Sequence, residues 1–242
     1  MMWGLPRAAP RSVWSMMNKL LIAVVIALGL SGCATPTGMA FQDDGEQAAE
    51  KKNPVFLMAV TLANKYKTSY QPRLVVMHVE KPDAKERADR INFLPDEKAR
   101  DETDSSDSGN NYLLRLELSD GQYEIVGLTS RAGIFPISGY FFTPMHSPLE
   151  AKGPGVFYLG HVNATVRERQ DNEFKAGPSV PLIDQAIAGA SGGTFDVEIT
   201  DAWDADKAAF LAKFPVLAGV TVQKAVLPAF DRAKAQQWWE AH

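Results

Sequence analysis

The chain has 242 residues, a length that suits one large domain or two small ones. Hydrophobic residues make up 45% and charged residues 22%, so the chain can bury a core, which argues against wholesale disorder. The formal net charge of −4 gives no basic footprint, and we expect no nucleic-acid partner. A single cysteine cannot form an internal disulfide.

An apolar run of eleven residues, Leu20 to Leu30, lies near the N-terminus. It is too short to span a bilayer, which needs about 20 residues, but it has the length of a signal-peptide core. Lys19 directly precedes the run, and no acidic residue occurs before Asp43. These features predict a signal peptide over residues 1–32.

The sequence Leu-Ser-Gly-Cys follows that run and ends at Cys33. It resembles the lipobox of bacterial lipoproteins, in which a leucine and two small residues precede an invariant cysteine. The resemblance implies that the Cys33 thiol receives a diacylglyceryl group, and that cleavage makes Cys33 the first mature residue and frees its amine for an acyl chain. The alternative is a buried cysteine after an ordinary hydrophobic helix, but the polar residues that follow favour the lipoprotein.

Two further expectations concern this N-terminal region. Initiation at Met16 or Met17 would give a compact signal, so we expect residues 1–15 to be a start-site artefact. Ala34 follows the cysteine, and the resemblance implies export to the outer membrane, facing the periplasm, rather than retention at the inner membrane. Loss of the three basic residues of the signal changes the charge from −4 to −7, so we expect the lipid to make the membrane contact.

Residues 33–53 are polar and small, and they predict a flexible lipidated tether. The body is expected over residues 54–230. Its first apolar run, 54–63, fits a short helix or a buried strand, whereas residues 73–80 are rich in β-branched side chains and predict a strand. Residues 81–111 carry charges of both signs and predict a long, partly mobile polar insertion.

The clearest predicted element is a hairpin over residues 112–130. Alternate apolar residues of 112–118 share one face, Asp120-Gly121 supplies a tight turn, and the following residues return as a second strand. Residues 131–154 mix aromatic residues with Gly and Pro and predict irregular strand and loop. Residues 156–167 predict one long strand or a strand pair.

Helices and strands mix in the last third of the chain. The predicted elements are a helix within 179–190, a strand over 194–200, a helix capped by Asp204 and ended by Pro215, a strand within 220–227, and a short helical tail over 231–242.

Several short strands, with helices mainly late, predict a mainly β fold, a β-sandwich with a few peripheral helices. The stretches DGQYEIVGL, PGVFYLGHV and DADKAAFLAKFPVL resemble a pattern in uncharacterised bacterial envelope lipoproteins. That resemblance implies a prealbumin-like or immunoglobulin-like sandwich, and it implies no activity.

No motif predicts a catalytic or metal site. Gly189 to Gly193 fits G-x-S-x-G around Ser191, but a nucleophile elbow needs a strand before the serine and a helix after it, and the predicted order is reversed. The four histidines are not spaced for a shared metal on one helix, and the aspartates near Gly109 fail the EF-hand spacing. We therefore predict no cofactor except the acyl groups on Cys33.

The aromatic-rich stretch Ile134–Pro148 is the best candidate for binding. Its candidate residues are Phe135, Tyr140, Phe141, Phe142 and Met145. The alternative is that these side chains fill the sandwich core.

The sequence therefore favours a lipid-anchored envelope protein with a binding or assembly role, in contact with the membrane and with envelope proteins as partners. The alternative is an envelope hydrolase whose site, centred on Ser191 or a histidine, forms only in the fold.

Overall fold

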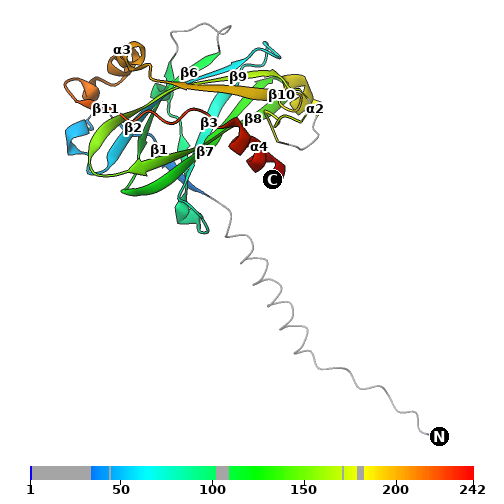
Figure 1. The fold of residues 1–242 in the computed structure, drawn as a ribbon, viewed down its shortest axis with the longest axis horizontal. Helices are drawn as coiled ribbons and strands as arrows, with labels where there is room; N and C mark the ends of the chain where they lie inside the picture. Colours follow the sequence, from blue (N-terminus) through cyan, green and yellow to red (C-terminus); the bar gives the residue numbers. More distant parts are fainter. Residues whose placement is uncertain (2–33, 44, 102–108, 171, 179–182) are drawn as a thin grey trace.

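The computed structural model describes residues 1, 34–43, 45–101, 109–170, 172–178 and 183–242. Within these residues the chain forms two β-sheets with three α-helices around them, so the mainly β prediction is confirmed (Figure 1). Cys33 and nearly all of the predicted signal peptide lie outside the described residues. No helix in the described part of the chain has the length and apolar character needed to cross a membrane.

Sheet A contains five strands. In spatial order they are β1 (Thr35–Gly38), β4 (Arg90–Leu94), β3 (Arg73–Glu80), β7 (Gly121–Ile134) and β8 (Ile137–Ala151). β1 runs parallel to β4, and the other neighbours are antiparallel.

Sheet B contains six strands. Five follow the order β10 (Gly193–Thr200), β9 (Gly155–Glu168), β2 (Pro54–Asn64), β6 (Asn110–Glu117) and β5 (Arg100–Asp101). The sixth, β11 (Val222–Lys224), pairs with the first part of β9, whereas β10 pairs with its last part. β2 and β9 are parallel although about a hundred residues separate them, so their pairing needs the whole intervening chain.

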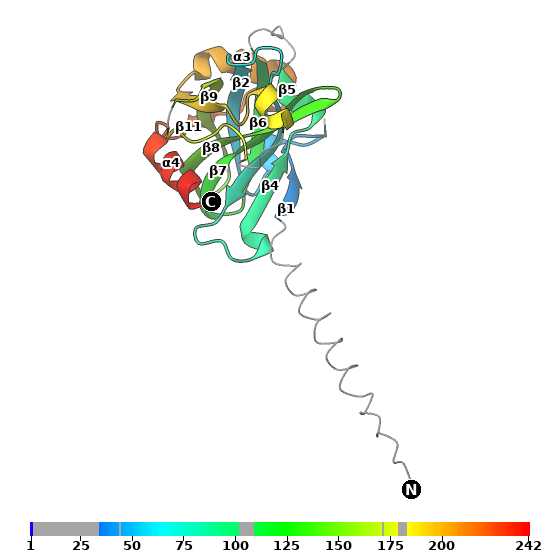
Figure 2. The same cartoon turned by 90° about the vertical axis from the view of Figure 1, so that its right-hand side faces the viewer.

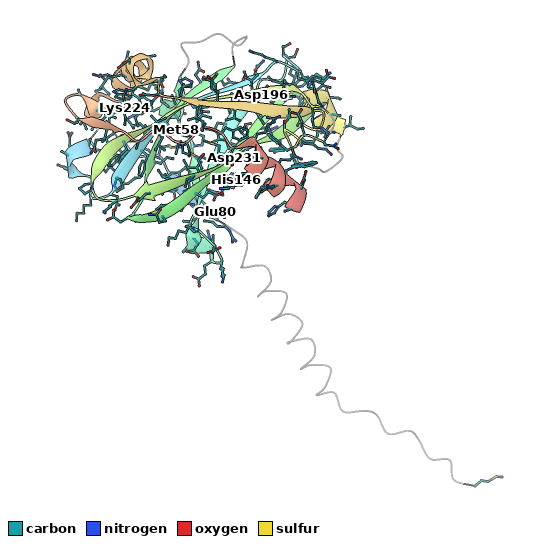
Figure 3. The ribbon with its side chains drawn as sticks, in the orientation of Figure 1. Met58, Glu80, His146, Asp196, Lys224 and Asp231 are labelled. Carbon is teal, nitrogen blue, oxygen red and sulfur yellow. The ribbon has the colours of Figure 1, made fainter. Side chains whose placement is uncertain are left out.

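The two sheets share one apolar core, to which β2, β6 and β9 contribute from sheet B and β3, β4, β7 and β8 from sheet A. Met58 of β2 is fully buried near the centre of the body (Figure 3). The other face of β2 packs into a second cluster that includes Phe210 and Phe214. Burial on both faces explains why β2 is a continuous apolar run, and it decides between the helix and the strand that residues 54–63 allowed.

Helices lie at the margins of the sheets: α2 (Ile183–Ala188), α3 (Trp203–Lys213), α4 (Arg232–Ala241), and the 3-10 turns η1 (Ala48–Glu50), η2 (Arg87–Asp89), η3 (Glu97–Ala99) and η4 (Pro215–Leu217). α3 covers the outer face of sheet B, and Figure 1 shows it at the top of the body. α4 lies against β8, where the rings of Trp238 and Phe142 are 5.2 Å apart. The predicted cap at Asp204 is wrong, because α3 begins at Trp203 after Ala202 and Asp204 lies inside its first turn.

The predicted hairpin across Asp120-Gly121 is wrong. β6 pairs with β2 and β5, whereas β7 pairs with β3 and β8, so this turn carries the chain from sheet B to sheet A. The hairpin forms instead between β7 and β8, in a stretch for which the sequence predicted irregular structure. Residue alternation shows which side chains share a face, but it does not identify the partner strand.

Two segments predicted as tether and insertion belong partly to the body. Within residues 33–53, β1 pairs with β4, and Met39 to Phe41 are at most 4% exposed. Within residues 81–111, β4 lies between β1 and β3, and Phe93 is fully buried. Each prediction followed average polarity, but a short strand needs only one or two buried side chains to hold it in a sheet.

Candidate functional site

Exposed large apolar residues of the body gather around the β7–β8 hairpin. Exposed fractions are 56% for Ile134, 98% for Phe135 and 48% for Tyr140 on the hairpin, and 79% for Ile183 and 38% for Ile187 on α2. We call these five residues the hairpin surface. Only Val75 and Leu94 are other exposed large apolar residues in the described part of residues 34–242.

The tip of the hairpin is unusual for a turn. Ile134 pairs with Ile137, and the two residues between them, Phe135 and Pro136, close the loop. Turns are normally rich in Gly, Pro, Asn, Asp and Ser, so Pro136 is an ordinary turn residue and the apolar side chains beside it are not. An isoleucine and a nearly fully exposed phenylalanine at a tip have no such role, and grouped exposed apolar residues typically mark a binding surface.

The five predicted binding residues divide between surface and core. Phe135 and Tyr140 are exposed, whereas Phe141 and Met145 are at most 2% exposed and belong to the core. Phe142 lies under α4 against Trp238, so it is not part of an open surface. Phe141 and Met145 fill the core instead, and Phe142 packs beside α4, because alternate residues of β8 face opposite sides of sheet A and α4 covers part of the outer side.

Sequence reasoning missed Ile183 and Ile187. They are four residues apart on α2 and therefore share one face of the helix. Their spacing is visible in the sequence, but only the packing of α2 shows that both side chains are exposed.

α2 is fixed to the edge of β8 by two side chains, because Asp184 accepts from the Ser138 backbone N–H (3.4 Å) and Gln185 bonds to Tyr140. The Tyr140 backbone N–H donates to Oε1 of Gln185 (2.5 Å), and Nε2 of Gln185 donates to the Tyr140 carbonyl (3.0 Å). A Cβ on Gly139 would lie 2.5 Å from the Cβ of Ala188, so the glycine allows the helix to approach. The two parts of the hairpin surface are therefore held in a defined relation.

Two arginines flank this surface. Arg73 of β3 pairs with Arg131 of β7, which in turn pairs with Tyr140, so the three side chains form one row on one face of sheet A. Both arginines are exposed, and neither has an ion-pair partner in the described part of the chain. Like charges directly opposite each other are unfavourable within a sheet. The row therefore brings two positive charges beside the exposed apolar residues. Nε of Arg131 donates to the Ser138 hydroxyl (2.5 Å), and the Ser138 backbone N–H donates to Asp184 (3.4 Å).

A second candidate site lies on the outer face of sheet B. Nε2 of His161 is 2.8 Å from the Thr61 hydroxyl, and Nδ1 of His161 is 3.0 Å from Oδ1 of Asp206. Hydroxyl, imidazole and carboxylate follow each other in the order used for acyl transfer. The Tyr158 hydroxyl donates to the other oxygen of Asp206 (2.5 Å). Burial, together with this carboxylate, raises the pKa of Tyr158 far above its ordinary value, so the phenol stays protonated.

Thr61 has a competing partner. Its hydroxyl is also 2.7 Å from Oδ1 of Asn111 on β6, and one hydroxyl proton can be donated to only one acceptor at a time. Asp206 lies on α3 and binds both Tyr158 and His161 of β9. These hydrogen bonds therefore also attach α3 to sheet B, which is a structural role independent of catalysis.

Ser191 does not form the alternative centre. It lies in the turn between α2 and β10, so a helix precedes it and a strand follows, as the sequence predicted. The four histidines all have other partners among the described residues, on Asn92 and Thr129, Glu124, Asp206 and Thr61, and the Trp238 carbonyl.

Metal binding and similarity to known proteins give no further information about these sites. Across the described residues, no group of three or more His, Cys, Asp or Glu side chains could hold a metal ion. The chain matches no protein-family model, and comparisons with curated proteins and with solved structures find no match either.

Proposed function

We propose that this chain is a lipid-anchored envelope protein, held through Cys33 at the outer membrane and facing the periplasm, whose body binds another envelope component through the hairpin surface. The observation that carries the binding role is Phe135, which is 98% exposed at the tip of a regular hairpin. Apolar area of this kind gains free energy when it leaves water. The Leu30-Ser31-Gly32-Cys33 sequence supports the anchor.

The body is proposed to be a prealbumin-like or immunoglobulin-like sandwich. Two sheets with a shared core support this proposal, as does the mainly antiparallel pairing of their strands. The parallel pair β2–β9 and the parallel edge strand β1 are features that a comparison with such sandwiches has to accommodate.

The anchor is tested by expressing the full chain in a diderm bacterium with labelled palmitate. We expect label in the protein and a mature N-terminus at acylated Cys33 by peptide mass. Cys33→Ser should leave an uncleaved, unlabelled precursor. A Cys33→Ser protein that is still cleaved and held in the membrane would overturn the anchor.

The binding role is tested with a photo-crosslinking amino acid at position 135 in intact cells. The matched control carries the same group at Lys207, an exposed residue on α3. Adducts, to lipid or to protein, are expected at 135 in excess of those at 207. Equal yields at the two positions would remove the hairpin surface from the proposal.

A second candidate function is hydrolysis, which the Thr61–His161–Asp206 geometry favours. In this function His161 would accept the Thr61 proton as the hydroxyl attacks an acyl carbon, and would return it to the leaving group as the old acyl bond breaks. Water would then release the acyl group from Thr61, and Asp206 would hold the imidazole in place throughout. A fluorophosphonate probe should then add to Thr61 and fail to add to Thr61→Ala, with Ser191→Ala reacting normally. A chain that forms no adduct at Thr61 is not this hydrolase.

A further inference from the structure

The segment between Cys33 and β1 is short, which limits how far the body can lie from an anchor at Cys33. Only Ala34 separates Cys33 from Thr35, the first residue of β1. Two residues span at most about 7 Å when fully extended. If Cys33 is acylated, as the proposed function requires, β1 must lie within about that distance of the bilayer surface. The body therefore rests at the membrane and cannot sample space far from it.

The register of sheet A gives the separation between the anchor and the hairpin surface. Strand register places Thr35, Ile91, Val79 and Ile125 in one row across sheet A. β1 and β7 run in the same direction across this row, so Cys33 precedes the row and Ile134 lies nine residues beyond it, roughly 30 Å at the usual rise of a strand. In Figure 2, the green loop of the β7–β8 hairpin lies at the upper right of the body and β1 lies at the lower right.

We propose that the hairpin surface docks on the bilayer that holds the lipid anchor, so that the body contacts the membrane at two separated places. This inference rests on the proposed lipid anchor and names the component that the hairpin surface binds.

The chemistry of the hairpin suits a lipid interface. Ile134 and Phe135 form an apolar tip that enters the acyl boundary, and Tyr140 offers a ring with a polar end, which is typical of the headgroup region. Arg73 and Arg131 lie in the same row as Tyr140 and attract anionic headgroups. Charge attraction acts within about 8 Å at physiological ionic strength, so this local pair is effective although the mature chain has a net charge of −7.

The shape of the surface favours a bilayer over a folded protein partner. A protein interface has a packed apolar centre surrounded by a polar rim. Phe135 projects from a two-residue turn and keeps 98% of its exposure, so the neighbouring residues form no rim around it. A bilayer closes around a protruding apolar tip without a preformed pocket.

The single cysteine of the chain allows a clean experiment. Cys33→Ser in the mature chain, residues 33–242, gives a protein with no thiol and no signal peptide that could itself insert. Phe135→Cys in this background receives an environment-sensitive fluorophore. The matched control is Lys207→Cys on α3, which Figure 2 shows at the top of the body, away from β1.

Vesicles of phosphatidylethanolamine and phosphatidylglycerol are then added to each labelled protein. We expect a blue shift and increased emission for the dye at 135 and no change at 207. Unlabelled protein should bind the same vesicles in sedimentation assays, and Arg73→Gln with Arg131→Gln should weaken that binding roughly thirty-fold. Phe135→Ser should weaken it further, with unchanged circular dichroism showing that each variant is folded.

Three outcomes would overturn the bilayer as the occupant. The first is no spectral change at 135 on these vesicles, and the second is an equal change at 207. The third is a dimer in sedimentation velocity that Phe135→Ser abolishes, which would identify a second copy of the chain as the occupant. Palmitate labelling of Cys33 and crosslinking from position 135 are separate measurements. They distinguish failure of this inference from failure of the proposed function.

Discussion

Arg115 and Asp96 form an ion pair in which the arginine side chain has no exposure to solvent. The same guanidinium donates through Nε to the Ala40 carbonyl (2.8 Å) and through Nη1 to the Leu113 carbonyl (3.0 Å). Its Cζ lies 4.1 Å from the centre of the Phe214 ring. One side chain on β6 therefore joins the segment after β1, the segment before η3 and the end of α3.

Asp96→Ala should destabilise the body by about 3–5 kcal/mol, because it leaves a buried guanidinium without its carboxylate. It also removes the acceptor of the Ala99 N–H at the start of η3. Urea unfolding measures the change. Glu97→Ala is the neighbouring exposed control and should change the free energy of unfolding by less than about 0.5 kcal/mol. Equal effects of the two changes would contradict the role of the ion pair.

Thr143→Val should be neutral or stabilising by about 1 kcal/mol. Thr143 is fully buried on β8, and within the described part of the chain its hydroxyl has no hydrogen-bond partner. An unsatisfied buried hydroxyl is unfavourable, and valine has nearly the same shape. Thermal unfolding checks the sign, and a clear loss of stability would show that the hydroxyl has a partner, for example a bound water.

Gln185→Leu should loosen α2 and uncover the edge of β8. The side chain of Gln185 satisfies both backbone groups of Tyr140, and leucine can satisfy neither. We expect faster hydrogen exchange at the Tyr140 amide and a loss of about 1–3 kcal/mol in stability. The amide of Phe142, which donates to the Ala176 carbonyl, is the internal control and should exchange as before. Unchanged exchange at Tyr140 would contradict this prediction.

Two histidines on the outer side of sheet A should make stability depend on pH. Burial lowers the pKa of His78 below 6.5, against a partly opposing hydrogen bond to Asn92. Burial likewise lowers the pKa of His146, which lies beside α4 in Figure 3, against its hydrogen bond to Glu124. Nearby Lys234 adds to the lowering at His146. Both rings therefore take up protons more readily in the unfolded chain.

Stability from these two groups is fully present above about pH 6.5 and decreases as the pH falls below that value, because the unfolded chain then binds more protons. Urea unfolding at several pH values just above and below 6.5 measures the slope. His78→Gln and His146→Gln should each reduce the slope in that window. If stability still depends on pH in the double variant, that dependence belongs to other titratable groups.

The hydrophobic patterns in the sequence identified many strands but not their partners. Residues 54–63, 73–80 and 194–200 are strands, and alternation in 112–118 correctly separated the buried leucines from Arg115 and Glu117. Arg115 nevertheless proved fully buried, because α3 and the segment after β1 cover the outer face of sheet B. Local pattern carries no information about what lies over a face.

The candidate sites show the same division. Phe135 and Tyr140 were recognisable in the sequence as members of an aromatic stretch, but the pairing of β7 with β8 decided that they are exposed and that Phe141 is not. The contact between Thr61 and His161 joins residues one hundred positions apart, and no spacing rule predicts it.

The sequence by itself determined the mainly β class and the position of most strands, because these depend on residue order over short distances. Only the tertiary structure decided that β1 begins two residues after Cys33 in the chain and pairs with β4, so that little tether remains. It also brought the row of Arg73 and Arg131 beside an exposed apolar tip. These relations depend on which strands pair and on which elements cover them. The free energy of the whole core determines both.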